Sequence, residues 1–331
     1  MKLILPLVLL SSFSLAAPLT LKEALAQASQ QPTVLADQVA LQVAQSNLQR
    51  TQEDPLATQL SLLQAQQAVR EAQATYNQAL AQAKSQIVSA YTGVLEAQKG
   101  LEVAQLGVSL AQRGVKVAEI QLKNGGGTQL ALQQAQNKLA SAEQGLSQAQ
   151  EGLALAQANL ANYVGSFQDL APLGSLPAPP PASAIETVLS ANPTLVKLED
   201  AVQLAQFELN LLDPLYSSQQ QIQEARSGLQ QAQAGLTSAR QGLQIAVQNL
   251  YNQVSLDHKA LAVAQGALAN AEQAYSYDET RYKNGLISEI ALLQSQLALE
   301  QAQLSELQAE ANYLNAYYAF FAGPSTSGGQ P

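Results

Sequence analysis

The apolar residues of this chain recur every three or four positions over long stretches, the pattern of amphipathic helices. Over 128–164 leucines step by seven residues and are followed by alanines three residues later, which is the spacing of a left-handed coiled coil. A second helix of this kind is predicted over 288–322, where only Glu300 interrupts the apolar seam. The leucines of the first seam are Leu132, Leu139, Leu146, Leu153 and Leu160.

The prolines leave two long stretches free, 56–171 and 215–323. Because proline breaks a helix interior, these stretches can each hold a very long helix, from 56 to about 123 and from 215 to about 283. At 1.5 Å per residue each is roughly 100 Å long. Asn-Gly turns at 124–125 and 284–285 then reverse the chain into the return helices, and shorter helices broken at Pro32 and Pro193 precede each hairpin.

The two halves of the chain repeat at an offset near 160 residues. Gln31-Pro32-Thr33 recurs as Asn192-Pro193-Thr194, and Lys123-Asn124-Gly125 recurs as Lys283-Asn284-Gly285. A constant offset indicates a tandem duplication. The predicted divisions are a signal peptide over 1–16, a first hairpin repeat over 17–171, a Pro-rich linker over 172–183, a second repeat over 184–323 and a disordered tail over 324–331.

The predicted fold is therefore all-α, built from two duplicated long antiparallel hairpins. Two hairpins close only part of a circle, so helices with more than one small or apolar stripe favour a symmetric ring of several chains. Glycines also step by seven, and we expect a close helix–helix contact to offset the cost of about 1 kcal/mol for each mid-helix glycine. They are Gly93, Gly100, Gly107 and Gly114, then Gly228, Gly235 and Gly242. Repeat drift in a biased sequence is the alternative.

Composition and charge exclude several classes of function. The chain has no cysteine, no tryptophan and one histidine, and its net charge is -9. Disulfides, thiolate metal sites, an acylated lipoprotein cysteine and histidine-based catalysis are thus disfavoured, and the acidic balance argues against nucleic-acid binding. Lys2, the apolar run Leu3–Leu10 and the small-x-small Ser14-Leu15-Ala16 predict export through a cleaved signal peptide.

The stretch Arg281-Tyr282-Lys283-Asn284-Gly285-Leu286-Ile287-Ser288 is followed by Leu292-Leu293-Gln294-Ser295-Gln296-Leu297. It resembles the helix-turn signature of the TolC-like outer-membrane efflux (channel-tunnel) family, and the duplication and the mid-chain prolines fit as well. The resemblance implies a homotrimer whose hairpins build a periplasmic tunnel, working with a periplasmic adaptor and an inner-membrane pump. It also implies a location in the periplasm in association with the outer membrane.

In that family the hairpin tips dock the adaptor. By position the resemblance places these tips at Gly125, Gly126, Gly127 and Thr128 in the first repeat, and at Gly285, Leu286, Ile287 and Ser288 in the second. The family's leucine is replaced by glycine in the first tip, which implies weaker docking there. Tyr282 aligns with a tyrosine that constricts the tunnel entrance. The acidic entrance positions are Ala291 and Gln294 here, so cation binding is not expected.

The family's membrane strands have no room in this sequence. Their place holds only Gln52–Leu56 and Leu212–Leu215, whereas a membrane strand needs about 9–11 residues. We therefore predict the helical body without barrel strands, which leaves a separate outer-membrane protein as a possible partner.

Two functions remain open from the sequence. One is a tunnel that conducts small molecules or proteins outward in efflux or type I secretion; the other is a non-conducting coiled-coil spacer of the envelope. An enzyme is not expected, because Asp213, His258, Asp278 and Glu279 form no nucleophile–base arrangement, and the sequence predicts no cofactor or metal. The aromatic residues near the helix ends are interpreted as core caps: Tyr163, Tyr313, Tyr317, Tyr318, Phe320 and Phe321.

Overall fold

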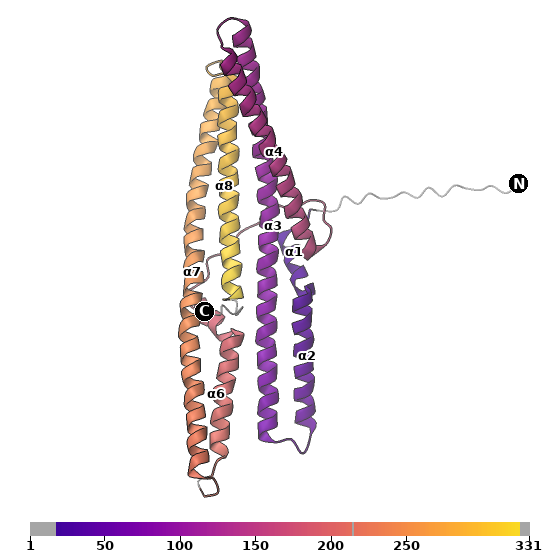
Figure 1. Cartoon of the computed structure of the whole chain (residues 1–331), viewed down its shortest axis with the longest axis vertical. Coiled ribbons are helices and arrows are strands. Elements are labelled where there is room, and N and C mark those ends of the chain that lie inside the picture. Colours follow the sequence, from indigo (N-terminus) through magenta and orange to yellow (C-terminus); the bar gives the residue numbers. More distant parts are fainter. Residues whose placement is uncertain (1–17, 214, 325–331) are drawn as a thin grey trace, which may run out of the picture.

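Two long helical hairpins lie side by side in the computed structural model, which describes residues 18–213 and 215–324 (Figure 1). The first consists of α3 (Gln59–Lys123) and α4 (Gln129–Val164), and the second of α7 (Gln219–Lys283) and α8 (Glu289–Ala322). These four helices begin and end within four residues of the positions that the sequence predicts. The predicted signal peptide and all of the predicted tail beyond Pro324 lie outside the described residues.

Shorter helices complete each half of the chain. The first half opens with α1 (Leu21–Ala26), the 3-10 helix η1 (Gln27–Gln30) and α2 (Pro32–Glu53); the second opens with α5 (Ala184–Ser190) and α6 (Pro193–Leu211). Helices α2 and α6 lie beside the lower halves of α3 and α7 in Figure 1, while α4 and α8 lie beside the upper halves. Pro32 and Pro193 each occupy the first turn of a helix, where the missing N–H costs nothing.

Local chemistry explains where the long helices begin and end. Each starts at a hydroxyl side chain that accepts a hydrogen bond from the backbone N–H three residues later, as Thr58 does from Ser61 and Ser288 from Ala291. The tips turn through Gly125 and Gly285, whose φ angles of 74° and 69° are accessible to glycine at little cost. The predicted glycine turns are confirmed.

The segments where the family's strands would fit are short turns. Helix α2 ends at Glu53 and α3 begins at Gln59, and in the repeat α6 ends at Leu211 and α7 begins at Gln219. Asp54 and Asp213 stabilise these turns by accepting a hydrogen bond from the backbone N–H two residues later, at 2.9 and 2.8 Å. The described residues contain no strand beyond an isolated bridge between Leu19 and Leu170. The all-α fold class is confirmed.

Two hydrophobic clusters, one in each repeat, pack the short helices against the long ones. In the first, Tyr91 of α3 is fully buried among α1, η1 and α4, and its hydroxyl lies 2.9 Å from the Leu19 carbonyl and 2.6 Å from the Ala171 carbonyl. In the second, Tyr313 of α8 is fully buried beside α5 and α7 and donates to the Pro177 carbonyl at 2.7 Å. Both tyrosines thus fasten the chain that connects α4 with α5. The core-cap interpretation holds for Tyr313 and Phe320, whereas Phe321 is 40% exposed.

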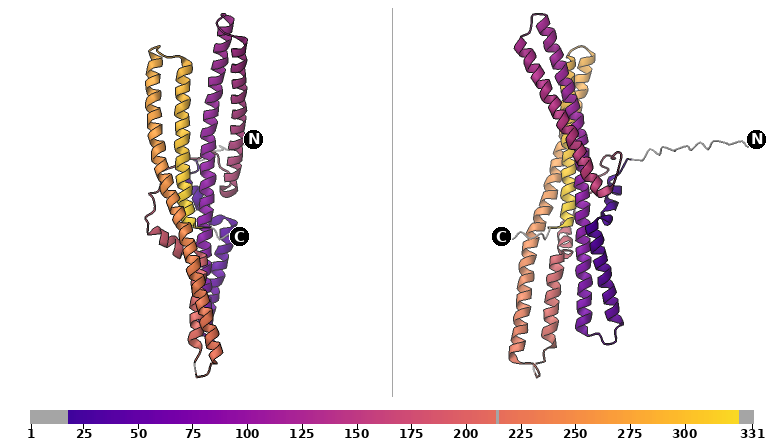
Figure 2. Two further views of the ribbon diagram at one scale, coloured as in Figure 1. Left: turned by 60° about the vertical axis from the view of Figure 1, so that its left-hand side comes forward. Right: turned by 45° about the vertical axis from the view of Figure 1, so that its right-hand side comes forward.

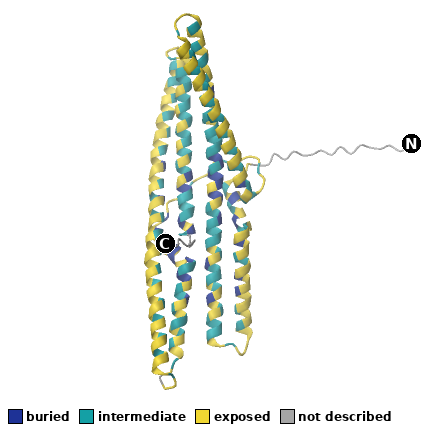
Figure 3. Ribbon diagram, in the orientation of Figure 1, coloured by how far each residue is buried: buried dark blue, intermediate teal, exposed yellow. Residues whose placement is uncertain are grey.

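The upper half of the molecule is a layer of helices in the order α4, α3, α8, α7. Helix α3 packs against α4 on one side and α8 on the other, and α7 packs against α8. Helices α1, η1 and α5 cover one side of the layer, which we call the capped face; the opposite side is the open face. Few residues along the outer helices are buried (Figure 3), and the two tips stand apart in both views of Figure 2.

The heptad glycines do not make the close contact that the sequence predicts, so this part of the interpretation is wrong for a single chain. A Cβ atom built at Gly93, Gly100, Gly107 or Gly114 meets no atom within 4 Å. Tyr91 points to the capped face, and Gly93 follows it by two residues, or about 200° around the helix. The α3 glycines therefore lie on the open face, which no helix within residues 18–213 and 215–324 covers.

Gly107→Ala is expected to raise the free energy of unfolding by about 1 kcal/mol, because alanine restricts the unfolded chain and fits the helix without a clash. Gly127→Ala is the matched control: its Cβ would lie 2.8 Å from the Leu122 nitrogen, so it should lower stability. Urea unfolding followed by circular dichroism measures both. A destabilised Gly107→Ala protein would show that another backbone packs against this stripe.

Candidate functional site

The open face is hollowed near the tips. A groove of about 460 Å³ runs across α4, α3 and α8, and α3 lines it with Gly107, Leu110, Ala111 and Gly114. Because α3 and α4 belong to the first hairpin and α8 to the second, this groove spans the junction between the two hairpins. The residues that define the groove include Gly107, Gly114, Gln134, Lys138, Gln294 and Leu297.

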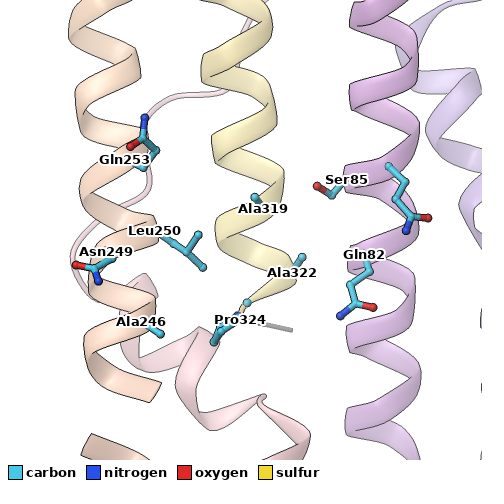
Figure 4. A pocket seen from close by; sticks show the side chains of 11 residues that line it. Gln82, Ser85, Ala246, Asn249, Leu250, Gln253, Ala319, Ala322 and Pro324 are labelled. Carbon is cyan, nitrogen blue, oxygen red and sulfur yellow. The ribbon is translucent and has the colours of Figure 1, made fainter. Parts of the chain in front are cut away.

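A second groove of about 850 Å³ lies at mid-height between α3, α8 and α7 (Figure 4). Gln82 and Ser85 project from α3 on one side, and Asn249 and Gln253 project from α7 on the other. Gln86, which also lines this groove, precedes Gly93, Gly100, Gly107 and Gly114 by whole heptads. Both grooves therefore belong to one continuous strip of the open face.

Four ion pairs join the first repeat to the second, one of them between Arg70 and Glu199 of α6 at 4.0 Å, and in each the cation is on α3. Arg70 lies 2.6 Å from the buried Asp200 of α6, Arg113 lies 3.0 Å from Glu289, and Lys99 contacts Glu300. Desolvation lowers the pKa of Lys99, but its hydrogen bonds to Glu300 and Glu102 outweigh this and leave the pKa raised. Glu300, the predicted break in the α8 seam, is thus a link between hairpins, which no periodicity within one helix reveals.

The structure places the predicted tip residues at one end of the molecule, in two separate turns (Figure 1). The first tip presents only glycine backbone at 125–127, and Thr128 caps α4. The second tip presents Leu286, which is 68% exposed, while Ile287 is partly buried and Ser288 caps α8. Tyr282 lies in the last turn of α7 and is 41% exposed. The two tips therefore differ in apolar surface.

Both edges of the layer expose apolar side chains. On α7, Ile245, Leu256 and Val263 are 66%, 59% and 74% exposed. They lie on the side of the helix opposite Val247 and Val254, which are buried within the second repeat. Leu256 and Val263 also step by seven from the groove-lining Asn249, so their row borders the open face. On α4, Leu155 is 73% exposed and points away from the seam that contains Leu153. A single chain leaves both edges without a partner.

Other kinds of site find no support in the described part of the chain. No helix within residues 18–213 and 215–324 has the length and apolar character needed to span a membrane. No group of three histidine or acidic residues there has the spacing to hold a metal ion. His258 is exposed and lies against Tyr313, with 5.3 Å between the ring centroids, and Asp278 and Glu279 are paired with Arg281 and Lys283.

Glu310 of α8 is expected to make stability depend on pH. Burial raises its pKa from 4.5 to about 7, with a further contribution from the charge and hydrogen bond of Glu306. The folded protein therefore binds a proton that the unfolded chain has released, and the free energy of unfolding should fall as pH rises from about 4.5 to 7. Glu310→Gln should reduce this fall by about 1 kcal/mol after allowance for solvent screening.

Urea unfolding at pH 5, 6, 7 and 8 measures this slope. The exposed Glu272→Gln on α7 is the control and should leave the slope unchanged. If wild type and Glu310→Gln follow the same pH profile, the carboxyl is not held protonated by the fold.

Comparison with known families decides the affiliation of the chain. The sequence profile of the family described as outer membrane efflux protein matches residues 57–166 and 185–321, one segment in each half. The chain belongs to the outer membrane efflux protein family. This family consists of efflux channels and not of enzymes, so the prediction that the chain is not an enzyme is confirmed, as is the resemblance.

Solved structures with the same fold include outer-membrane channels of low sequence identity. CusC is 14% identical with a TM-score of 0.62, and each chain is covered to 92%. The Campylobacter jejuni CmeC outer membrane channel is 12% identical with a TM-score of 0.64, covering 93% of this chain and 87% of its own. VceC from Vibrio cholerae is 17% identical with a TM-score of 0.60, covering 92% and 96%. No curated protein sequence matches the chain.

Proposed function

We propose that this efflux-family chain is one subunit of a periplasmic helical tunnel, in which the open face lines the lumen. The observation that carries the proposal is the single layer of four helices, hollowed on one face and apolar along both edges. Such a layer becomes closed only when its α7 edge packs against the α4 edge of another copy. Family membership supports a homotrimer associated with the outer membrane.

The tunnel would belong to an efflux or type I secretion system and conduct small molecules or proteins outward. Its partners would be an inner-membrane pump, a periplasmic adaptor and, because the connections that replace the strand segments are short, a separate outer-membrane protein. The proposal includes export to the periplasm after removal of residues 1–16. It also divides the exported chain into two repeats over 17–171 and 184–323, a linker over 172–183 and a tail over 324–331.

The adaptor would dock at the hairpin tips, with Gly285, Leu286, Ile287 and Ser288 as the stronger contact and Gly125, Gly126, Gly127 and Thr128 as the weaker. This order is supported by the exposed Leu286 side chain, because burying a leucine contributes about 1.5–3 kcal/mol. Tyr282, in the last turn of α7 beside this tip, would narrow the tunnel entrance.

Leu286→Asp should weaken adaptor binding by at least about tenfold, because the substitution removes the apolar contact and adds a charge that must be desolvated. Gly126→Asp places the same charge on the first tip and should have a smaller effect. In-cell cross-linking to the co-expressed adaptor, with purified-component titration, measures both. Equal loss at the two tips would contradict the proposed order.

Deleting the gene and complementing it with the wild-type chain tests the function itself. The expected result is increased drug susceptibility or lost protein secretion in the deletion strain, restored by the complementing chain. A deletion strain with unchanged susceptibility and unchanged secretion would rule out a transport role and favour a structural spacer.

A further inference from the structure

The open face carries little charge although the whole chain has a net charge of -9. On α8 the positions that step by seven from the groove-lining Gln294 are Gln301, Gln308 and Asn315. The positions on α3 that step by seven from Gln86 are all glycines up to residue 114. Amides and bare backbone thus form these rows of α8 and α3, although the Asn315 Oδ1 atom is itself buried. On α7 the row that steps by seven from the groove-lining Asn249 continues as the uncharged, exposed Leu256 and Val263.

The acidic residues of α8 project from the other side of the helix. Glu306 and Glu310 each lie two residues from Gln308, or about 200° around the helix. Glu300 is turned toward α3, where it pairs with Lys99. The charge of this helix is therefore placed away from the grooves.

The few charges that do flank the open face largely cancel. Arg113 is paired with Glu289 and Arg281 with Asp278. Asp257 accepts hydrogen bonds from the Gln253 amide at 2.9 and 3.0 Å, which leave its single negative charge in place. Lys138 lines the upper groove, and Glu96, which lies two heptads from the groove-lining Gln82, has the opposite sign.

We propose that the open face is a nearly neutral wall of amide groups, so that the conduit accepts cationic, anionic and uncharged solutes without selecting among them by charge. The consequence for cargo rests on the proposed function. A lumen wall with one predominant sign of charge would focus the field and change the local concentration of charged solutes by factors of 10 or more. Amide side chains both donate and accept hydrogen bonds, so they can contact solutes of either sign.

Single-cysteine variants test the wall directly, because the chain has no cysteine of its own. Gln294→Cys and Gln308→Cys place a thiol on the open face. Gln105→Cys places one on the capped side of α3, two heptads beyond Tyr91, where Gln105 is exposed. The purified full-length protein is treated with a cationic (trimethylammonium-ethyl) and an anionic (sulfonatoethyl) methanethiosulfonate at physiological ionic strength, and the two modification rates are compared.

We expect the cationic-to-anionic rate ratio at both open-face positions to stay within about fivefold of that for free cysteine, because a nearly neutral wall does not concentrate reagents of either sign. A ratio that differs by more than this, in either direction, would overturn the neutral wall. Residue 301 lies about 10 Å along the helix from residue 294. Adding Gln301→Glu to Gln294→Cys should therefore raise its ratio at about 10 mM ionic strength, where the screening length is about 30 Å, while the ratio of Gln105→Cys should not change. If Gln301→Glu does not raise the ratio at residue 294, or changes it equally at residue 105, then Gln294 and Gln301 do not share the open face.

These rates do not depend on transport. A deletion strain without a transport defect would refute the conduit while the rate ratios still report the charge of the wall. A restored transport phenotype together with a strongly biased ratio would refute charge-independent cargo and leave the conduit standing.

Discussion

Replacing Leu256 and Val263 with aspartate is expected to convert the assembled protein into monomers. These two side chains lie in one heptad row of α7 where its free edge borders the open face, 59% and 74% exposed in a single chain. If a neighbouring copy covers them, each contributes about 1.5–3 kcal/mol at every interface. Their loss alone corresponds to at least about a hundredfold weaker association, and buried carboxylates would weaken it further.

Sedimentation equilibrium of the purified full-length chain measures this change. The matched control replaces Leu56 and Leu215 with aspartate, because these residues are 88% and 85% exposed in the Asp-Pro turns and lie away from the α7 edge. The control should assemble like the wild type. An unchanged mass for Leu256→Asp/Val263→Asp, at concentrations where the wild type is just assembled, would contradict the proposed interface.

Tyr313→Ala is expected to lower the free energy of unfolding by about 3–5 kcal/mol, the cost of removing a large aromatic side chain from a core. The Tyr313 ring is fully buried and packs against His258 and Tyr317, and its hydroxyl bonds to the Pro177 carbonyl. The variant therefore loses both the centre of the second cluster and the attachment of the chain between the repeats.

Tyr313→Phe separates the two contributions, because it removes only the hydrogen bond and should cost about 1–2 kcal/mol. Tyr216→Ala, at a residue that is 89% exposed, should change stability by less than about 0.5 kcal/mol. Urea unfolding followed by circular dichroism compares the three. A Tyr313→Ala protein as stable as Tyr216→Ala would contradict the described packing of α5, α7 and α8.

The long helices could be predicted from the sequence because their signals are local. Pro32 and Pro193 start helices, hydroxyl residues cap them, and Gly125 and Gly285 supply the positive φ of the tips. The heptad leucines of α4 face α3 as their spacing predicts. The family was likewise accessible, since its signature lies within one turn and the following helix.

Contacts between helices could not be predicted from such local signals. The spacing of the glycines showed that they share one side of α3, but not that this side faces open space. The link between Lys99 and Glu300 joins residues 201 positions apart, and nothing local to α8 predicts the partner of its one charged seam residue. The sequence likewise does not mark Glu310 as a group with a raised pKa, because the shift depends first on its burial between helices.

The number and arrangement of copies test the central claim most directly. Electron microscopy of the purified assembled protein, viewed along its long axis, should show a hollow ring with threefold symmetry and the open face of every copy turned inward. A monomeric particle or a solid bundle without a central channel would contradict the tunnel and support a spacer.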